Sequence, residues 1–158
     1  MLISPSLRAI RKIMRAAEQG ERKLAQATGL TPSQVLVLQE VDRGGDVMPS
    51  EVALALQLSQ ASITNIVDRL AELKLVARRK GERDKRQVRL TLTDRGRQML
   101  ETAPDLLQNR FTRRFQTLPT WEQAMMLATL ERLAELLDAG DVEAGPMPHS
   151  DTIDRSAA

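Results

Sequence analysis

The sequence predicts a mainly α-helical protein with one small β-hairpin. Apolar residues recur at steps of three and four over most of the chain, which is the spacing of one helix face. Residues 87–92 alternate instead between polar and apolar side chains, which is the period of a half-buried strand. The length of 158 residues suits one compact domain, or one domain with an extension.

The first expected helix covers residues 6–27. Its apolar stripe is narrow and follows alternating steps of four and three, interrupted once by Glu21: Ile3, Leu7, Ile10, Met14, Ala17 and Leu24. A stripe of this width suits packing against other helices, including helices of a second chain. We therefore assign residues 1–30 to an N-terminal dimerisation helix.

A capping box marks the start of the second expected helix. Thr31 can accept a hydrogen bond from the backbone of Gln34, whose side chain can reach back, and Pro32 fits the first helical position. The helix is expected to run to about Val41. A loop at residues 43–46 follows it.

A helix-turn-helix comes next. A short helix opens at residues 48–51, and Ser59 is a good N-cap for another that runs to about Leu73. The buried stripe of this later helix is expected to contain Ile63, Ile66, Val67 and Leu70. Its opposite face carries small polar side chains and two charges: Gln60, Ser62, Thr64, Asn65, Asp68 and Arg69.

A β-hairpin follows these helices directly. Residues 76–80 are expected to form its first strand, residues 81–86 a charged loop, and residues 87–92 its second strand. A hairpin in this position is the winged-helix arrangement, in which the loop is the wing. We assign residues 31–93 to a winged helix-turn-helix, DNA-binding lobe.

The rest of the chain is expected to be helical up to residue 140. One helix runs from Asp94 to about Gln116 with a kink at Pro104, because proline removes a backbone hydrogen bond. A second capping box, Thr120 with Gln123, starts another helix. The apolar stripe of that helix is Met126, Leu130, Leu133 and Leu137.

These helices divide the chain beyond the lobe into two parts. We assign residues 94–140 to C-terminal dimerisation helices. Residues 141–158 are rich in Asp, Gly, Pro and Ser and are expected to be a disordered acidic tail.

Charge is distributed unevenly along the chain. The net charge is +2, but residues 78–97 carry nine basic and three acidic side chains, and residues 138–158 carry one and five. A basic cluster of this density is the electrostatic footprint of a polyanion site, or else a solvated charged face. The helix-turn-helix beside it favours the polyanion site.

Composition excludes several classes of function. The chain has no cysteine, which rules out thiol catalysis and zinc–thiolate sites, and its single histidine, His149, lies in the tail. We find no glycine-rich phosphate loop and no paired carboxylates with a plausible cleft, so we expect no enzyme, no cofactor and no metal site. No apolar run approaches the roughly 18 residues of a membrane span, and no signal peptide is evident, so we expect a soluble cytoplasmic protein.

Two motifs occur in order around the hairpin. The wing contains Asp84-Lys85-Arg86, and the second strand leads into Leu92-Thr93-Asp94-Arg95-Gly96. This combination, together with residues 58–70, resembles the multiple-antibiotic-resistance regulator (MarR) family of winged-helix transcription regulators. The likeness covers nearly all of the expected ordered chain.

Three positions depart from the pattern of that family. Lys74 stands where glycine usually closes the helix before the first strand, Asn65 stands where many members carry arginine, and Met48 replaces a polar cap. If position 74 needs a left-handed backbone, lysine costs roughly 1 kcal/mol relative to glycine.

The resemblance implies a homodimer that binds a palindromic site in double-stranded DNA and represses transcription. The helix after Ser59 would enter the major groove, and its DNA-binding candidates are Ser59, Gln60, Ala61, Ser62, Thr64, Asn65 and Arg69. The candidates for base edges are Gln60, Ser62, Thr64 and Asn65, while Arg69 would either reach a phosphate or brace the wing. Arg86 would enter a minor groove, oriented by Asp84, beside Arg83 and Lys85. The phosphate candidates are Ser33, Ser50, Arg78, Arg79 and Arg89.

The family also implies a small organic effector, bound between the lobe and the dimerisation helices. Candidate lining residues are Arg11, Met14, Arg15 and Phe111, for which a plain core or surface role is the alternative. Two other readings of the whole chain stay open. One is a regulator without an effector, and the other is a protein-interaction module that has lost DNA binding.

Overall fold

The computed structural model describes residues 1–81 and 87–139, which form seven helices and one two-stranded antiparallel sheet. In chain order the elements are α1 (Ile3–Thr28), α2 (Pro32–Gly44), α3 (Pro49–Ala55), α4 (Gln60–Glu72), β1 (Val76–Lys80), β2 (Val88–Leu92), α5 (Asp94–Thr102), α6 (Leu107–Gln116) and α7 (Thr120–Leu136). The expected fold class is confirmed: the protein is mainly helical, with a hairpin after a helix-turn-helix.

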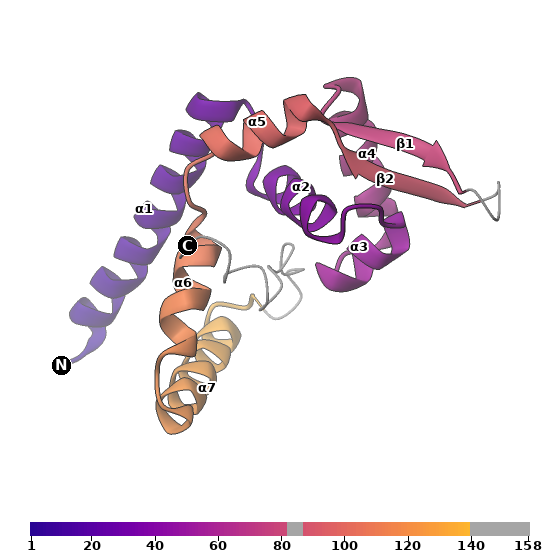
Figure 1. Cartoon of the computed structure of the whole chain (residues 1–158). Coiled ribbons are helices and arrows are strands. Elements are labelled where there is room, and N and C mark those ends of the chain that lie inside the picture. Colours follow the sequence, from indigo (N-terminus) through magenta and orange to yellow (C-terminus); the bar gives the residue numbers. More distant parts are fainter. Residues whose placement is uncertain (82–86, 140–158) are drawn as a thin grey trace.

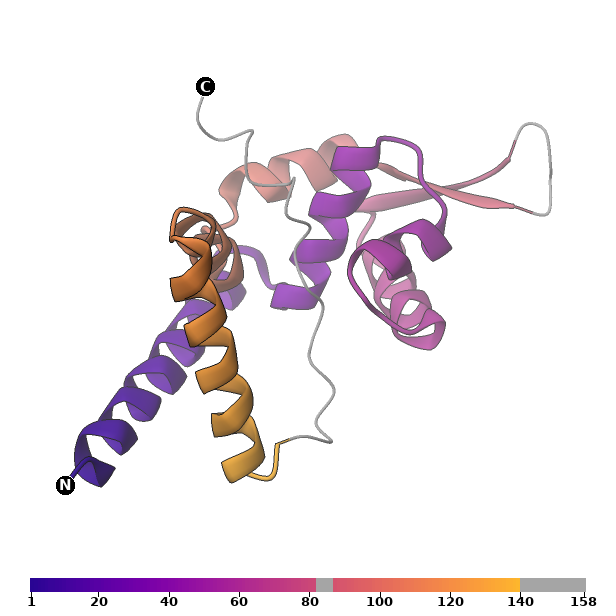
Figure 2. The same ribbon diagram turned by 90° about the horizontal axis from the view of Figure 1, so that it is seen from below.

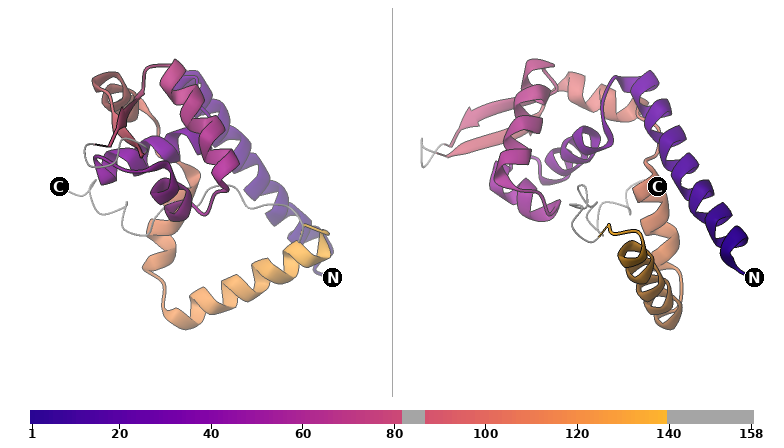
Figure 3. Two further views of the ribbon diagram at one scale, coloured as in Figure 1. Left: turned by 90° about the vertical axis from the view of Figure 1, so that its right-hand side faces the viewer. Right: turned by 180° about the vertical axis from the view of Figure 1, so that it is seen from behind.

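The elements lie in two groups (Figure 1). One group, which we call the lobe, contains α2, α3, α4, α5 and the hairpin, and the hairpin projects from the side away from α1. The other group, which we call the arm, contains α1, α6 and α7, with α6 beside the long α1 (Figure 3). Seen from below, α7 stands apart from the lobe (Figure 2).

The hydrophobic core lies mainly in the lobe, and Leu24 of α1 also belongs to it. The middle of α2 is buried on nearly every side, because apolar residues occupy four consecutive positions and a fifth one further on: Val35, Leu36, Val37, Leu38 and Val41. α4 buries Ile63, Val67 and Leu70 as predicted, while Ile66 is half-buried at the edge of the stripe. The capping box of Thr31 with Gln34 is also confirmed, with hydrogen bonds of 3.0 and 3.3 Å.

The hairpin pairs Val76 with Leu92 at its base and Lys80 with Val88 at its outer end. A third segment joins the sheet edge, because Val47 exchanges backbone hydrogen bonds of 3.1 and 2.7 Å with Leu90. The loop between α2 and α3 is thereby fixed against β2.

The expectation of one kinked helix from Asp94 to about Gln116 is wrong. The chain forms two helices, α5 and α6, with residues 103–106 between them. Ala103 is extended, with φ −68° and ψ 130°, because the ring of Pro104 disfavours a helical conformation in the residue before it. Leu106 then turns into the lobe core, so the break also supplies an apolar anchor.

The expected capping box of Thr120 with Gln123 is wrong as well. α7 begins at Thr120, its N-cap is Pro119, and no side chain of the described residues caps it. Gln123 donates instead to the main-chain oxygen of Leu118 at 2.8 Å. The threonine therefore lies one position too late to act as a cap.

Two helix boundaries differ from the sequence prediction in smaller ways. α1 begins at Ile3 rather than at residue 6. α2 extends to Gly44, and the loop predicted at residues 43–46 begins only at Gly45, which ends the helix with a φ of 74°. Glycine adopts that conformation without a steric penalty.

Candidate nucleic-acid interface

α4 presents a polar face to the outside of the lobe. Its N-cap Ser59 accepts a hydrogen bond from the backbone N–H of Ser62 at 3.1 Å, as predicted. The buried stripe on the inner side fixes the rotation of the helix. Of the predicted DNA-binding residues of this helix, Ser62 is half-buried and the others are exposed: Ser59, Gln60, Ala61, Thr64, Asn65 and Arg69.

Some polar side chains on this face already form hydrogen bonds within the protein, and others do not. Thr64 donates its hydroxyl hydrogen to the main-chain oxygen of Gln60 at 2.8 Å, and the hydroxyls of Ser59 and Ser62 lie 2.8 Å apart. Within residues 1–81 and 87–139, the side-chain amides of Gln60 and Asn65 have no hydrogen-bond partner. These amides therefore keep both donor and acceptor for a base edge.

Two of the predicted DNA-contacting arginines pair with carboxylates of the lobe. Arg69 lies 3.0 Å from Glu72, within α4. Arg78 on β1 forms an ion pair with Asp68 of α4. All four side chains are exposed, so each pair contributes roughly 0–1 kcal/mol to stability. The second pair nevertheless links α4 to the strand that leads to the wing.

The other two predicted phosphate-contacting arginines stand opposite each other on the hairpin. Arg79 of β1 and Arg89 of β2 are register partners. The carboxylate of Asp46 lies 3.9 Å from the Arg79 guanidinium and 3.7 Å from that of Arg89. A carboxylate oxygen of Glu51 in α3 is 3.7 Å from Arg89.

Sequence reasoning missed the three carboxylates that face these arginines. Asp46, Glu51 and Asp68 come from a loop, a helix start and a helix face that are remote from the strands in sequence. No local spacing signals such pairs, because they depend on how α3, α4 and the hairpin pack.

The remaining predicted contact residues fall into two sets. Ser50 is exposed in the first turn of α3, while Ser33 is half-buried in the first turn of α2. The wing residues lie outside the described part of the chain: Arg83, Asp84, Lys85 and Arg86.

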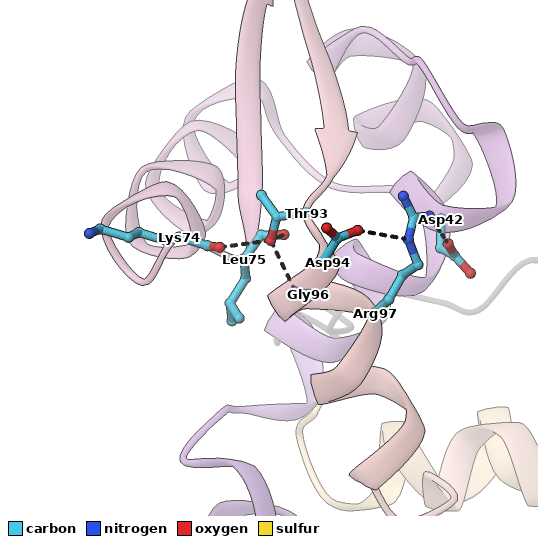
Figure 4. A network of polar contacts seen from close by, with 7 residues as sticks. All are labelled: Asp42, Lys74, Leu75, Thr93, Asp94, Gly96 and Arg97. Carbon is cyan, nitrogen blue, oxygen red and sulfur yellow. Dashed lines mark hydrogen bonds and ion pairs between the residues drawn. The ribbon is translucent and has the colours of Figure 1, made fainter.

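Thr93 fastens the base of the hairpin (Figure 4). Its hydroxyl lies 2.7 Å from the main-chain oxygen of Lys74 and 3.0 Å from that of Leu75, and it accepts a hydrogen bond from the N–H of Gly96 at 3.0 Å. One side chain therefore caps α5 and ties it to the end of α4. This is the structural basis of the Leu-Thr-x-x-Gly motif.

Arg97 extends the same network to α2. Its guanidinium lies 3.6 Å from Asp42 and 3.9 Å from Asp94. The ion pairs of Arg97 and the hydrogen bonds of Thr93 thus connect α2, α5 and the base of the hairpin (Figure 4).

The structure defines the backbone conformation or hydrogen bonding at two of the positions that depart from the family pattern, Lys74 and Met48. Lys74 has a φ of 59°, so a side chain occupies the left-handed conformation in which glycine would be unstrained. At the start of α3, the N–H of Met48 donates to Glu51 at 2.6 Å, which is half of a capping box without a hydroxyl cap.

A cavity of about 290 Å³ lies between α1, the start of α2 and the segment that leads into α6. Its lining mixes apolar side chains with carboxylates: Ala17, Gly20, Glu21, Leu24, Pro32, Ser33, Pro104, Asp105, Leu106, Leu107 and Gln108. The predicted pocket residues do not line it. Arg11 and Arg15 border a separate hollow on α1, and Met14 and Phe111 are exposed.

The described residues include no group of three or more histidine, aspartate or glutamate side chains placed to hold a metal ion. None of their helices is both long enough and apolar enough to cross a membrane.

A sequence profile described as MarR family matches residues 28–87. The chain is 35% identical over 68 residues to the HTH-type transcriptional repressor MdtR of Bacillus subtilis, a match that covers 43% of this chain and 44% of MdtR. It is 25% identical over 122 residues to the transcriptional repressor MprA of Escherichia coli, covering 76% of this chain and 69% of that protein. The chain thus spans under half of MdtR and about two thirds of MprA.

Solved structures share the fold over most of the chain. A MepR-like protein complexed with pseudoligands aligns with a TM-score of 0.59 at 26% identity, over 87% of this chain and 96% of the other. A cysteine-to-serine mutant of E. coli MarR complexed with operator DNA aligns with a TM-score of 0.52 at 25% identity, over 87% and 98%. The hairpin, the motif at its base and these matches together identify residues 28–87 as a winged helix of the MarR family, whose members are transcription regulators and not enzymes.

Proposed function

We propose that the protein is a homodimeric transcription repressor that binds a palindromic site in double-stranded DNA. The observation that carries this proposal is the polar face of α4, which is turned outward by a buried stripe and flanked by a basic hairpin. The E. coli MarR complex with operator DNA supports the same partner, and the names of MdtR and MprA support repression.

Sequence reading is assigned to α4. An α-helix fits the major groove, and the amides of Gln60 and Asn65, which have no hydrogen-bond partner among the described residues, suit the two-bond edge of adenine. The other contacts of α4 with the DNA are assigned to short side chains and one arginine: Ser59, Ala61, Ser62, Thr64 and Arg69. Because Arg69 lies at the far end of the helix, we assign it to the DNA backbone.

The wing and its surroundings are assigned to the DNA backbone and the minor groove. Arg86 would enter an A·T-rich minor groove, which is narrow and strongly negative, with Asp84 orienting it. Arg83 and Lys85 would contact phosphates beside it. The other phosphate contacts are Ser33, Ser50, Arg78, Arg79 and Arg89.

The arm supports assembly of two copies. α1, α7 and the C-cap residue of α7, Leu137, expose apolar side chains: Ile3, Leu7, Ile13, Met14, Trp121, Met125, Leu127, Leu130, Leu136 and Leu137. Pairing of two arms would cover them and would hold two α4 helices about 34–36 Å apart, which is one turn of DNA.

An effector site is the finer part of the proposal. The cavity between α1, α2 and the start of α6 lies where the lobe meets the arm, and its volume of about 290 Å³ suits a small organic molecule. We place the effector there, so Arg11, Met14, Arg15 and Phe111 would take part only through side-chain movement or through the partner chain.

Binding of the purified protein to the DNA that flanks its own gene tests the proposal. We expect a shifted band for a fragment with an inverted repeat, a mass of two chains per repeat, and steep weakening with salt. Equal affinity for a scrambled fragment would contradict sequence-specific binding. The proposal places the protein with the chromosome in the cytoplasm.

The effector is tested separately. Small organic cations, anions and neutral aromatic compounds are added to the preformed protein–DNA complex, and release is followed by fluorescence anisotropy. A filled cavity, as in Ala17→Phe, is expected to abolish release without weakening DNA binding. Release that survives in this variant would place the effector elsewhere.

A further inference from the structure

The cross-strand pair of Arg79 and Arg89 needs an anion. Like charges directly opposite each other on an antiparallel pair destabilise it. Asp46 supplies the anion, with its two carboxylate oxygens directed at the two guanidinium groups at 3.9 and 3.7 Å. At these distances the pairs are loose, longer than charge-assisted hydrogen bonds of about 2.7–2.9 Å.

The backbone fixes Asp46 in this position. The next residue, Val47, is bonded in both directions to Leu90, which is the neighbour of Arg89 on β2. Figures 1 and 2 show the loop before α3 running beside β2. The bridge therefore holds the main chain next to Asp46 against β2, which keeps the Asp46 carboxylate within reach of the arginine pair.

The two carboxylates beside the pair are not equivalent. Glu51 already accepts the N–H of Met48 at 2.6 Å and so is committed to the start of α3. The carboxylate of Asp46 has no partner among the described residues other than the two arginines. Asp46 can therefore be displaced from the pair without loss of a helix cap.

We propose that Arg79 and Arg89 together form a binding site for one backbone phosphate of duplex DNA, and that Asp46 occupies this site in the unbound protein. The pair is open to solvent, with the Arg79 side chain 62% exposed and that of Arg89 33% exposed. A phosphate oxyanion accepts hydrogen bonds from two guanidinium groups better than a loosely held carboxylate does.

This proposal rests on the proposed DNA binding and adds a function for Asp46. Because phosphates carry no sequence information, a carboxylate that competes with them weakens binding to every duplex by the same factor. Asp46 would thus lower nonspecific affinity without changing which sequence is preferred.

The test is Asp46→Asn, which removes the charge and keeps the shape. We expect binding to tighten about two- to fivefold for the inverted-repeat duplex and by the same factor for an unrelated duplex. Asp42→Asn is the matched control, because Asp42 is also an exposed aspartate paired with an arginine, but on α2. We expect it to change affinity by less than the Asp46 substitution does.

A double-mutant cycle separates displacement from general charge repulsion. In an Arg79→Gln/Arg89→Gln background the gain from Asp46→Asn is expected to vanish, because no phosphate site remains. A gain that persists in that background overturns the proposal, as does an Asp46→Asn protein that binds like the wild type. The DNA affinity of Asp46→Ser, which also removes the charge, is measured in parallel. Urea unfolding checks that each variant is folded.

The two duplexes also separate this proposal from the one on which it rests. If the wild type binds both duplexes equally but Asp46→Asn tightens both, sequence-specific binding fails and the phosphate site stands. If the inverted repeat is preferred and Asp46→Asn changes neither affinity, the phosphate site fails and the proposed function stands.

Discussion

Gly96 packs directly against the main-chain oxygen of Leu75. A Cβ on Gly96 would lie 2.3 Å from that oxygen and 2.9 Å from a methyl group of Leu92. Because Leu75 joins α4 to the hairpin, this contact lets α5 start immediately beside the end of α4. The last residue of the Leu-Thr-x-x-Gly motif is therefore fixed by a steric limit, not by backbone conformation.

Gly96→Ala is expected to destabilise the protein by roughly 2 kcal/mol, because the backbone of residues 75 and 96 must separate. Urea unfolding measures the change. Gly20→Ala is the control, since a Cβ there meets no atom within 4 Å and lies inside α1. That control is expected to stabilise by about 0.5–1 kcal/mol. Equal effects of the two substitutions would contradict the steric argument.

Lys74→Gly is expected to raise the free energy of unfolding by about 1 kcal/mol, because lysine there has a φ of 59°. Thermal and urea unfolding check the change. Lys74→Ala, which keeps the Cβ, is expected to bring no gain. A glycine variant no more stable than the alanine variant would show that the position is not strained.

Asn65→Ala is expected to weaken binding to the inverted repeat by about 1–3 kcal/mol and to relax the preference at one base pair in each half-site. Its amide has no other partner in the described residues, so the loss falls on the DNA contact. Competition with single-base variants of the repeat measures the preference. Uniform weakening across all variants would instead assign Asn65 to the backbone.

Arg86→Ala is expected to weaken binding to the repeat about tenfold or more while the proposed dimer stays intact, because the proposed minor-groove contact of Arg86 is lost. Gel shift and light scattering are the two measurements. An A·T to G·C change in the flanks of the repeat should matter for the wild type and not for the variant. Unchanged affinity would remove the wing from the mechanism.

Leu130→Glu is expected to prevent formation of the proposed dimer, because it puts a charge on the exposed apolar face of α7. Light scattering after size-exclusion chromatography measures the mass. Leu54→Glu on α3 is the control, since Leu54 is more exposed but lies in the lobe. If both variants remain dimers, the assembly does not use this face of α7.

Much of the lobe could be predicted from local sequence. The caps at Thr31 and Ser59 and the strand at residues 76–80 are encoded within a few residues, and the structure matches them. Local signals failed where the outcome depended on neighbours in space. Pro104 breaks the helix locally, but the burial of Leu106, the N-cap of α6, in the lobe core has no signal in the residues that flank it.

The candidate interface also contains residues that local sequence predicts and residues that it does not. The outward face of α4 follows from its period, so Gln60 and Asn65 could be selected in advance. The carboxylates that pair with the arginines could not. Asp46 meets Arg89 only because a loop residue adds to the sheet edge, and such pairings between distant segments leave no trace in spacing.

The hydrogen bond from Thr64 to the main-chain oxygen of Gln60 limits what this side chain can distinguish. With its hydrogen committed inside the helix, the threonine offers lone pairs and a methyl group, but no donor. In the proposed DNA complex Thr64 would therefore match the exocyclic amino group of cytosine or adenine, or the C5 methyl of thymine, and would not match the paired acceptors of guanine. A guanine opposite this position would have to be met by another side chain or by water.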